Sequence, residues 1–364
     1  MKNTFGSSLT VTLFGESHGA AIGAVIDGIA PGIKIDNDYI ADRMDERRPF
    51  GKISTSRHED DIPEIVSGIF GGYTTGTPIC ILIKNKDSHS SDYEALRDTP
   101  RPSHADLTAR YKYHGFEDYR GGGHFSGRVT AALVAAGAIV RSALEKKGVL
   151  IGTHISRAGG IDDRDFGDIA ADIQELSHLE FPVLDGRAAE KILAKIEAAA
   201  ADGDSIGGIL ETAVTGLPEG VGEPWFDTVE GVLAHALYSV PAVKGVEFGA
   251  GFSFSDMKGS EANDPFLMKD GRIITATNNS GGVCGGITNG MPIIFRTTIK
   301  PTPSIFKEQK TVSLSRGENT TLKIAGRHDP AIIHRARAVV DAMSALALAD
   351  LLTVRYGTDY LREV

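Results

Sequence analysis

GRVTAALVAAGAIVRSALEKK, at positions 127–147, is a strong predictor of a long helix. Its lysines fall in the last turn of a predicted helix, where cations suit the helix dipole, and Gly148 follows as a stop. Small residues occupy several of its faces, which is unusual for a helix on the surface. We therefore predict a helix that is largely buried in the core.

The second part of the chain repeats features of the first. A second long Ala-rich helix is predicted at 331–352, and GYTTGTPI at 72–79 matches GITNGMPI at 286–293 as GxTxGxPI. Further strands are predicted at 9–14, 21–29, 65–70, 78–83, 207–214, 245–248 and 292–299, and further helices at about 36–48, 188–201 and 226–237. The repeat indicates two structurally similar halves.

We expect the two halves at about 1–150 and 205–364, with a polar segment at 155–204 that connects them. Each half places a sheet beside helices. The acidic residues of the connecting segment are expected to face solvent. We predict an α+β fold in which residues 1–364 form one compact sandwich of two pseudo-repeated halves, rather than two independent domains.

The composition limits what the surface can bind. Lys and Arg number 38 against 48 Asp and Glu, a formal net charge of −10, which opposes general attraction to nucleic acid or to a membrane surface.

We expect neither a targeting peptide nor a membrane-spanning helix, and we expect a cytoplasmic location. Cys80 and Cys284 have no CxxC spacing, so neither disulfides nor a zinc site are expected. The 43 glycines follow no period and point to roles at single positions.

The common cofactor and hydrolase motifs are absent from the sequence. No GxxxxGK[ST] occurs, and GGGHFSG at 121–127 lacks the GxGxxG spacing and follows a polar segment instead of a strand. Neither GxSxG nor HExxH is present. A Rossmann dinucleotide site and the common hydrolase sites are therefore not expected.

Three histidines lie in short loops bounded by glycine or proline. GESHG presents His18, RPSHAD presents His104, and GRHDP presents His328. Asp329 in the last loop precedes a predicted helix, whose first backbone N–H groups could face an anion. One such histidine is more often structural than catalytic, whereas three in such loops favour a common site.

Five arginines near Gly and Pro turns suggest recognition of anions. They are Arg47, Arg48, Arg57, Arg128 and Arg327. A guanidinium group matches the geometry of phosphate and carboxylate. The segment KPTPSI, which begins at Lys300, adds an ammonium group and hydroxyls directly after a strand. In an acidic chain, these residues predict a local site for a small molecule with several negative charges.

Seven stretches follow one order over nearly the whole chain. They are GESHG at 15–19, RPSHADLT at 101–108, DYRGGGHFSGRVTAALVAAGAI at 118–139, PAVKGVEFGAGF at 241–252, NNSGGVCGGITNGMPI at 278–293, KPTPSI at 300–305 and GRHDP at 326–330. Together they resemble the chorismate synthase family. The resemblance implies a homotetramer with a β-α-β-α sandwich fold. It also implies an enzyme of aromatic amino acid biosynthesis that converts 5-enolpyruvylshikimate 3-phosphate into chorismate and phosphate by a 1,4-anti elimination, with reduced FMN and no net redox change.

The resemblance also implies roles for the matching residues. His18 would act as an acid beside the departing phosphate, and His104 would manage a proton near N1 of the reduced flavin. Asp329 would help to take the proton from flavin N5. Because a histidine titrates near pH 6.5 unless perturbed, both rings can change charge at physiological pH.

The implied substrate contacts are Arg47, Arg48, Arg128 and Arg327. The implied flavin contacts are Arg48, His124, Phe125, Ser126, Pro241, Ala242, Gly286, Lys300, Pro301, Thr302, Pro303, Ser304 and Arg327. The chain departs from the family pattern at positions 124 and 125, at Glu46 and at Pro303. These departures change the expected binding contacts and leave the implied catalytic residues in place.

Two alternatives from other classes remain open. A metal-dependent hydrolase would use the histidines and Asp329 as ligands, although no HxxxH spacing occurs and the nearby arginines would repel a cation, so no metal is expected. A non-catalytic flavin-binding protein would bind FMN without a reaction. No reductase domain or dinucleotide fingerprint is present, so we expect an external reductant for the flavin, with NADPH acting only indirectly.

Overall fold

Two five-stranded antiparallel sheets frame the protein. The computed structural model describes residues 2–49, 51–54, 61–86, 96–324 and 328–362. The first sheet has the order β1 (Thr4–Phe5), β2 (Thr10–Gly15), β3 (Ala21–Asp27), β7 (Ile79–Lys84) and β4 (Glu64–Ile65). The second has the order β11 (Val243–Phe248), β16 (Ile293–Ile299), β10 (Gly208–Thr215), β8 (Leu150–Ala158) and β9 (Ile161–Asp162).

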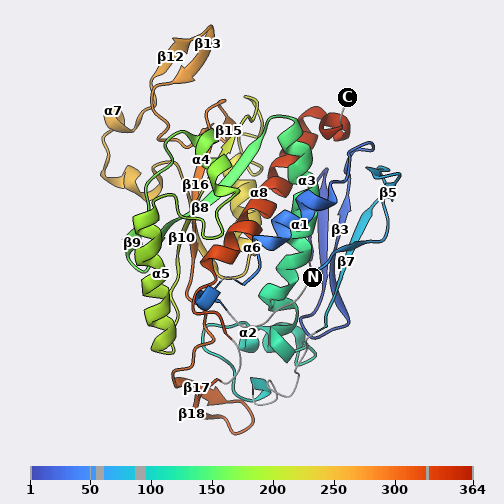
Figure 1. Cartoon of the computed structure of the whole chain (residues 1–364), viewed down its shortest axis with the longest axis vertical. Helices are drawn as coiled ribbons and strands as arrows, with labels where there is room; N and C mark the ends of the chain where they lie inside the picture. Colours follow the sequence, from blue (N-terminus) through green and yellow to red (C-terminus); the bar gives the residue numbers. More distant parts are fainter. Residues whose placement is uncertain (1, 50, 55–60, 87–95, 325–327, 363–364) are drawn as a thin grey trace.

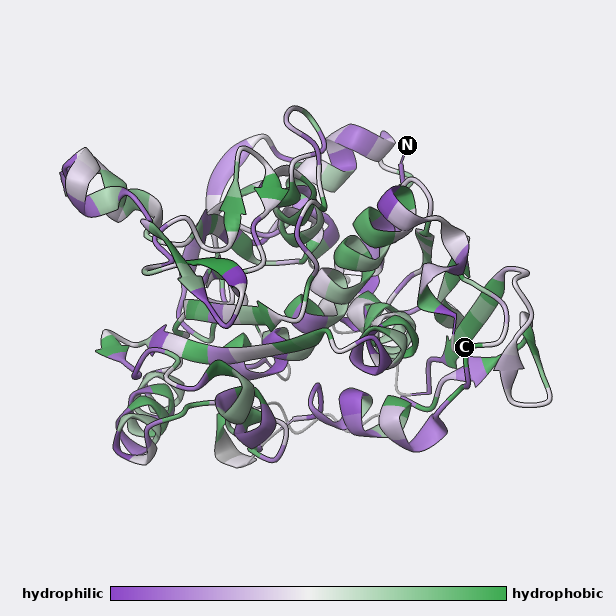
Figure 2. Ribbon diagram, turned by 90° about the horizontal axis from the view of Figure 1, so that it is seen from above, coloured by the Kyte–Doolittle hydropathy of each residue, from purple (hydrophilic) through white to green (hydrophobic). Residues whose placement is uncertain are grey.

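Helices fill the space between the sheets and cover the outer face of the second one (Figure 1). The central layer consists of α1 (Asn37–Asp45), α3 (Thr130–Lys146), α6 (Val229–Ser239) and α8 (Ile333–Tyr356). The outer layer consists of α4 (Ile169–Leu176) and α5 (Gly186–Ala201). In Figure 2 the hydrophobic colouring concentrates on the strands and on the helices between them. The predicted α+β fold with β-α-β-α layers is confirmed.

Small residues allow the two long helices to cross in direct contact. A Cβ added to Gly137 of α3 would lie 2.4 Å from Cβ of Ala342 in α8, so only glycine fits at this crossing. Most residues of both helices are buried, which confirms the prediction made for 127–147. Among the described residues, the stretch Gly127–Lys146 is long and apolar enough to cross a membrane. In this structure, however, 89% of its most apolar part is buried inside the protein.

The two GxTxGxPI segments make equivalent contacts with the turns that follow β3 and β10. Oγ1 of Thr74 accepts a hydrogen bond from the N–H of Ile33 at 2.9 Å and donates one to the carbonyl of Ala30 at 2.7 Å. In the same way, Oγ1 of Thr288 accepts from the N–H of Val221 at 2.9 Å and donates to the carbonyl of Pro218 at 2.7 Å. These matching contacts support the proposal of two similar halves, which stays a prediction.

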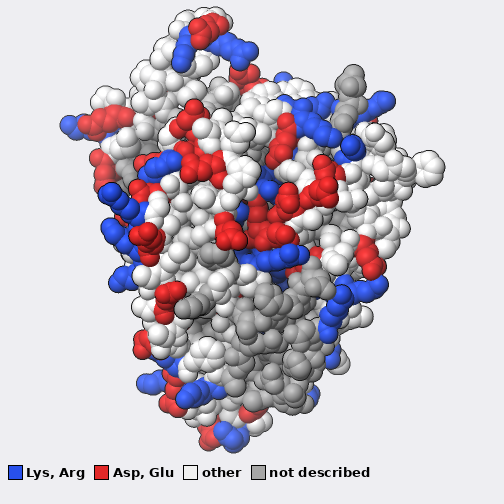
Figure 3. All heavy atoms as spheres, viewed as in Figure 1, with Lys and Arg blue, Asp and Glu red and all other residues white. Residues whose placement is uncertain are grey.

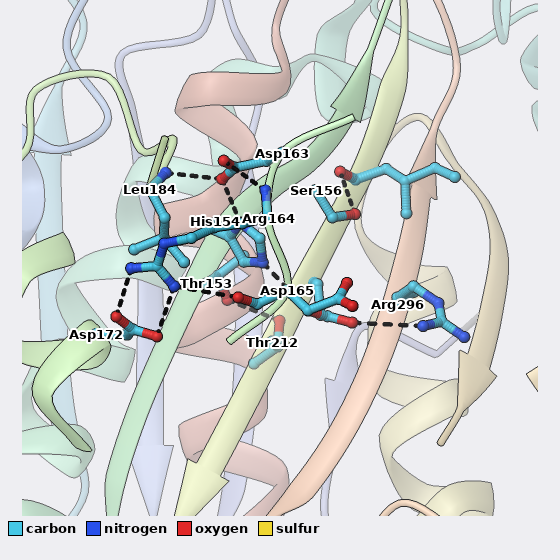
Figure 4. A network of polar contacts seen from close by, with 12 residues as sticks. Thr153, His154, Ser156, Asp163, Arg164, Asp165, Asp172, Leu184, Thr212 and Arg296 are labelled. Carbon is cyan, nitrogen blue, oxygen red and sulfur yellow. Dashed lines mark hydrogen bonds and ion pairs between the residues drawn. The ribbon is translucent and has the colours of Figure 1, made fainter. Parts of the chain in front are cut away.

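The predicted connecting segment 155–204 needs a correction. It contains the end of β8, an inner strand of the second sheet, and the whole outer helix layer. The expectation that its acidic residues face solvent is wrong for Asp163 and Asp172, because both carboxylates are buried in a polar network (Figure 4). Arg164 holds Asp172 with two bonds of 2.9 and 2.6 Å.

His154 of β8 lies at the centre of this network. Its Nδ1 is 2.8 Å from Oδ2 of Asp163, and its Nε2 is 3.2 Å from Oε2 of Glu211. Burial lowers the pKa of His154, but the two carboxylates outweigh burial and raise that pKa above its usual value. A strand that carries such internally satisfied polar groups looks solvent-exposed in the sequence alone.

One buried carboxylate fastens the start of the chain to the C-terminal helix. Asp350 of α8 accepts hydrogen bonds from three successive backbone N–H groups, those of Ser7, Ser8 and Leu9, at distances from 2.7 to 3.0 Å. These bonds fix the entry into β2. They thereby position the loop that follows β2, which carries GESHG.

The remaining elements are shorter and lie mostly at the ends of the sandwich. They are β5 (Ile69–Phe70), β6 (Tyr73–Thr74), α2 (Asp106–Tyr113), α7 (Gly259–Ala262), β12 (Phe266–Lys269), β13 (Arg272–Thr275), β14 (Val283–Cys284), β15 (Ile287–Thr288), β17 (Gln309–Ser313) and β18 (Glu318–Leu322), with short 3₁₀ turns between them. The pair β12–β13 projects away from the body (Figure 1).

Candidate active site

Three consecutive glycines bring the two predicted catalytic histidines to one turn. Gly121, Gly122 and Gly123 have φ values of +59°, +82° and +53°, which residues with a side chain rarely adopt. A Cβ on Gly121 would lie 2.5 Å from Cδ2 and 2.6 Å from Nε2 of His18. A Cβ on Gly122 would lie 3.2 Å from Cε1 and 3.4 Å from Nε2 of His104. Both rings therefore lie against the same turn.

The loop of His104 is anchored by its own neighbours. Nδ1 of His104 lies 2.5 Å from Oδ1 of Asp106. Arg101 donates from Nε and Nη2 to the two oxygens of Asp106, each at 2.8 Å, and its backbone N–H donates to Oδ2 at 3.0 Å. Arg101 also donates to Oγ of Ser304 at 3.2 Å. The RPSHAD loop is thus tied to the KPTPS segment, whose Ser304 lies 203 positions after Arg101 in the chain.

Two of the predicted substrate arginines share one carboxylate. Nη1 of Arg47 lies 3.1 Å from Oδ2 of Asp61, and Nη1 of Arg128 contacts the other oxygen, Oδ1. Arg47 also donates to Thr130 at 3.0 Å and to the carbonyl of Gly127 at 2.7 Å, which fixes it at the start of α3. All three charged side chains are at most 12% exposed. Their ion pairs are therefore weakly screened by solvent.

Further contacts extend this cluster to both the GESHG loop and Asp329. Arg128 donates from Nε to Asn85 at 3.1 Å, and Asn85 donates to two carbonyls of the GESHG loop at 3.0 and 2.8 Å. Arg335 donates from Nε to the carbonyl of Arg47 and from Nη1 to Asp329, each at 2.8 Å. Asp329 is therefore connected to the loop of His18 through residues at the start of α3 and α8.

A region of positive charge lies at the KPTPS segment. Burial lowers the pKa of Lys300, and the charge of Lys244 lowers it further. Within the described part of the chain, neither lysine forms an ion pair with a carboxylate. Oγ1 of Thr302 is buried and has no hydrogen-bond partner among the described residues. An anionic group with acceptor oxygens, such as a flavin phosphate, fits this combination.

Residues 124–126 support the surrounding backbone. Nδ1 of His124 lies 2.8 Å from the carbonyl of Gly15, at the end of β2. Oγ of Ser126 accepts from the N–H of Arg128 at 3.3 Å and caps the short turn before α3. Phe125 is 38% exposed, and its ring packs edge-on against Tyr113. All three lie beside the histidine turn.

The other predicted residues vary in their placement. Arg48 is half-exposed and pairs with Asp45 at 2.9 Å, apart from the arginine cluster. Gly286 packs against the start of α6, where a Cβ would lie 2.4 Å from a carbonyl and 2.6 Å from Thr228. Arg57 and Arg327 lie outside the described residues. The Pro241–Ala242 turn lies directly before β11. The loop after Lys300, which follows the end of β16, contains Pro301 and Pro303.

Backbone conformation marks the same region. Five described residues other than glycine have a positive φ, and three of them belong to the site: Asp61 (45°), Ser103 (58°) and Ala242 (74°). Such conformations cost about 1–3 kcal/mol and tend to collect at functional sites. The carbonyl of Ala242 accepts from the N–H of Lys300 at 2.9 Å, which holds the Pro241–Ala242 turn beside the lysine.

Several residues of the cluster were missed in the sequence. Asp61, Asn85 and Arg335 carry no local signal, whereas Arg101 and Asp106 stand inside the RPSHAD motif beside His104. The described residues contain no group of three or more His, Cys, Asp or Glu side chains placed to hold a metal ion.

Comparison with known proteins gives one consistent result. A family model described as chorismate synthase matches residues 9–353. Chorismate synthase of Pyrococcus abyssi is 48% identical over 351 residues, covering 96% of this chain and 97% of the relative. That of Methanosarcina barkeri is 47% identical over 353 residues, covering 96% and 95%. A crystal structure of a chorismate synthase superposes with a TM-score of 0.76 at 28% identity, covering 97% of this chain and 94% of that chain.

Proposed function

This chain belongs to the chorismate synthase family, a family of lyases, and from this premise we propose that it converts 5-enolpyruvylshikimate 3-phosphate into chorismate and phosphate. The proposed reaction is a 1,4-anti elimination that requires bound reduced FMN and causes no net redox change. The observation that carries the proposal is the placement of His18 and His104 against one glycine turn. We further propose that the enzyme acts in the cytoplasm.

The proposed roles follow from the chemistry of each side chain. His18 donates a proton to the departing phosphate, and His104 holds a proton at the N1 edge of the flavin. Asp329 is the final acceptor of the proton that the substrate loses, and its bond to Arg335 keeps its carboxylate in place. Reduced FMN, when bound, supplies transient electron density for the elimination.

Charge supports this choice of ligands. The substrate carries a phosphate and two carboxylates, and FMN carries another phosphate. Lys244 and Lys300 are proposed to bind the flavin phosphate, and Arg47 and Arg128 are proposed to bind the substrate anions. On the face shown in Figure 3, acidic and basic side chains are interspersed, so attraction of small anions is a property of the site and not of that surface.

Anaerobic release of phosphate tests the proposal. The purified chain is mixed with 5-enolpyruvylshikimate 3-phosphate and chemically reduced FMN, and His18→Ala and His104→Ala serve as variants. Rapid release by the wild type, with a loss of about 10²-fold or more in each variant, is expected. Absence of release would contradict the proposal. FMN binding that survives both substitutions without any reaction would favour the non-catalytic alternative, and stoichiometric zinc or manganese would favour the hydrolase.

A second assay concerns the reductant. We propose that the chain depends on an external source of reduced flavin, because the sequence has no dinucleotide fingerprint. With oxidised FMN and NADPH alone, no phosphate release is expected. Turnover under these conditions would show that the chain reduces its own flavin.

The projecting pair β12–β13 supports a homotetramer, which we also propose. Phe266, Met268 and Ile273 share one face of this hairpin and are 76%, 68% and 65% exposed. Two strands alone bury too little to be stable, and exposed apolar patches mark contact surfaces. Light scattering should report four copies for the wild type and fewer for Phe266→Ser with Met268→Ser. A monomeric wild type would contradict the proposal.

A further inference from the structure

Asp106 makes the closest contact of any described carboxylate with the His104 ring. Its Oδ1 lies 2.5 Å from Nδ1, and both side chains are largely shielded, with 11% and 18% exposed. Nη2 of Arg101 also lies 3.0 Å from Nδ1. If Nδ1 carries a hydrogen, the contact with Asp106 is a hydrogen bond. If Nδ1 is bare, the contact with Arg101 is the hydrogen bond, because a guanidinium group can only donate.

The charge of Asp106 settles the direction of the bond. Burial raises the pKa of the Asp106 carboxyl, but the hydrogen bonds from Arg101 and His104 outweigh burial and hold that pKa well below its usual range. Asp106 is therefore a carboxylate and can only accept. A contact of 2.5 Å between a carboxylate oxygen and Nδ1 requires a hydrogen on Nδ1. Arg101 consequently bonds to Asp106 and not to the ring.

The Nε2 side of the ring lies beside the glycine turn. A Cβ on Gly122 would meet Cε1 and Nε2 of His104, so this edge lies against the glycine turn shared with His18. With the hydrogen fixed on Nδ1, a neutral ring carries an unprotonated Nε2 on that edge.

We propose that Asp106 is a positioning residue for His104, which holds the ring as the Nδ1–H tautomer and presents Nε2 to the reacting groups. The proposal rests on the proposed function, in which His104 exchanges a proton at the flavin. Arg101 acts behind Asp106, since its three bonds to the carboxylate leave Asp106 no other orientation. Through Ser304, the same guanidinium ties this arrangement to the KPTPS segment.

Asp106→Asn tests the proposal with little change in shape. The amide can donate a hydrogen to Nδ1, which moves the ring hydrogen to Nε2 and removes the acceptor from the site edge. We expect kcat to fall about 10²-fold or more, while KM for the substrate and the Kd of FMN change less than threefold. An unchanged kcat would overturn the proposal.

Asp172→Asn is the matched control. Asp172 also accepts two bonds from one arginine and one from a backbone N–H, at 2.9, 2.6 and 2.7 Å, and its side chain is 8% exposed. It bonds to no described histidine. Comparable losses of thermal stability in the two variants, with a fall in kcat only for Asp106→Asn, are expected. Equal losses of kcat would assign Asp106 a purely structural role and overturn the proposal.

A measurement on the wild type needs neither activity nor a folded variant of Asp106. Solid-state NMR of ¹⁵N-histidine-labelled protein at pH 9, where histidine is ordinarily neutral, distinguishes protonated from bare ring nitrogens. The signals of His104 are identified by their loss in His104→Asn. Protonated Nδ1 with bare Nε2 is expected, and a hydrogen on Nε2 would overturn the proposal. Because this result is independent of turnover, failure of the proposed function would be recognised separately.

Discussion

Replacing Gly121 by alanine tests whether the glycine turn sets the position of His18. The new Cβ would lie 2.5 Å from Cδ2 of the ring, whereas ordinary carbon contacts are about 3.5–4.0 Å. The ring must therefore move by about 1 Å, and a displacement of about 1 Å can lower a rate about 10²-fold. The backbone, at a φ of +59°, adds a cost of about 1–2 kcal/mol in stability for any side chain.

Gly71 separates these two effects. It also has a φ of +59°, but a Cβ there would meet nothing within 4 Å. Gly71→Ala should therefore lose about 1–2 kcal/mol of unfolding free energy and keep its activity. Gly121→Ala should lose at least as much stability and about 10²-fold in the rate of phosphate release from reduced-flavin enzyme.

Urea unfolding and the anaerobic phosphate assay, run on both variants, give the comparison. Activity of Gly121→Ala equal to that of Gly71→Ala, at similar stability, would contradict this prediction. It would mean that the turn or the ring relaxes without effect on the reaction, and that the closeness of His18 to Gly121 has no catalytic consequence.

Three other predictions concern separate parts of the molecule. Asp350→Ala leaves three N–H groups at residues 7–9 without their acceptor and should lower the unfolding free energy, measured in urea, by about 3 kcal/mol. A loss below about 1 kcal/mol would contradict this prediction. Burial and nearby arginines lower the pKa of His334 to about 3. Between pH 6.5 and 3, His334 therefore binds a proton in the unfolded chain but not in the folded one. Lowering the pH from 7 to 5 should therefore destabilise the wild type by about 2 kcal/mol more than His334→Gln, and equal losses would count against it. Lys244→Ala and Lys300→Ala should each weaken FMN binding about tenfold in a fluorescence titration, and unchanged affinity would exclude them from the phosphate site.

The layers of the fold could be predicted from the sequence because they depend on regular patterns of apolar and small residues. The small residues of α3 predicted a buried helix, and Gly137 shows why they are needed, since a side chain there would collide with α8. The nature of the 155–204 segment was missed for the opposite reason. His154 and Asp163 are polar residues that satisfy one another inside the protein, and a sequence does not distinguish them from residues on a solvated surface.

The site was partly accessible in the same way. Loops bounded by glycine or proline predicted that His18, His104 and His328 serve one site, and the structure places the first two against one turn. Their connection to Asp329 runs through Asp61, Asn85 and Arg335, whose contacts span elements far apart in the chain. One sequence holds no information on which distant residues meet, so these three could not have been found.

The bond between Arg101 and Ser304 has a consequence for the newly made chain. The two residues are 203 positions apart, so the loop of His104 is tied to the KPTPS segment only after most of the chain exists. At about 5–20 residues per second on the ribosome, that interval lasts about 10–40 s. Binding of the proposed flavin would then begin only when synthesis is nearly complete, and it would report that these two distant segments of the chain have come together.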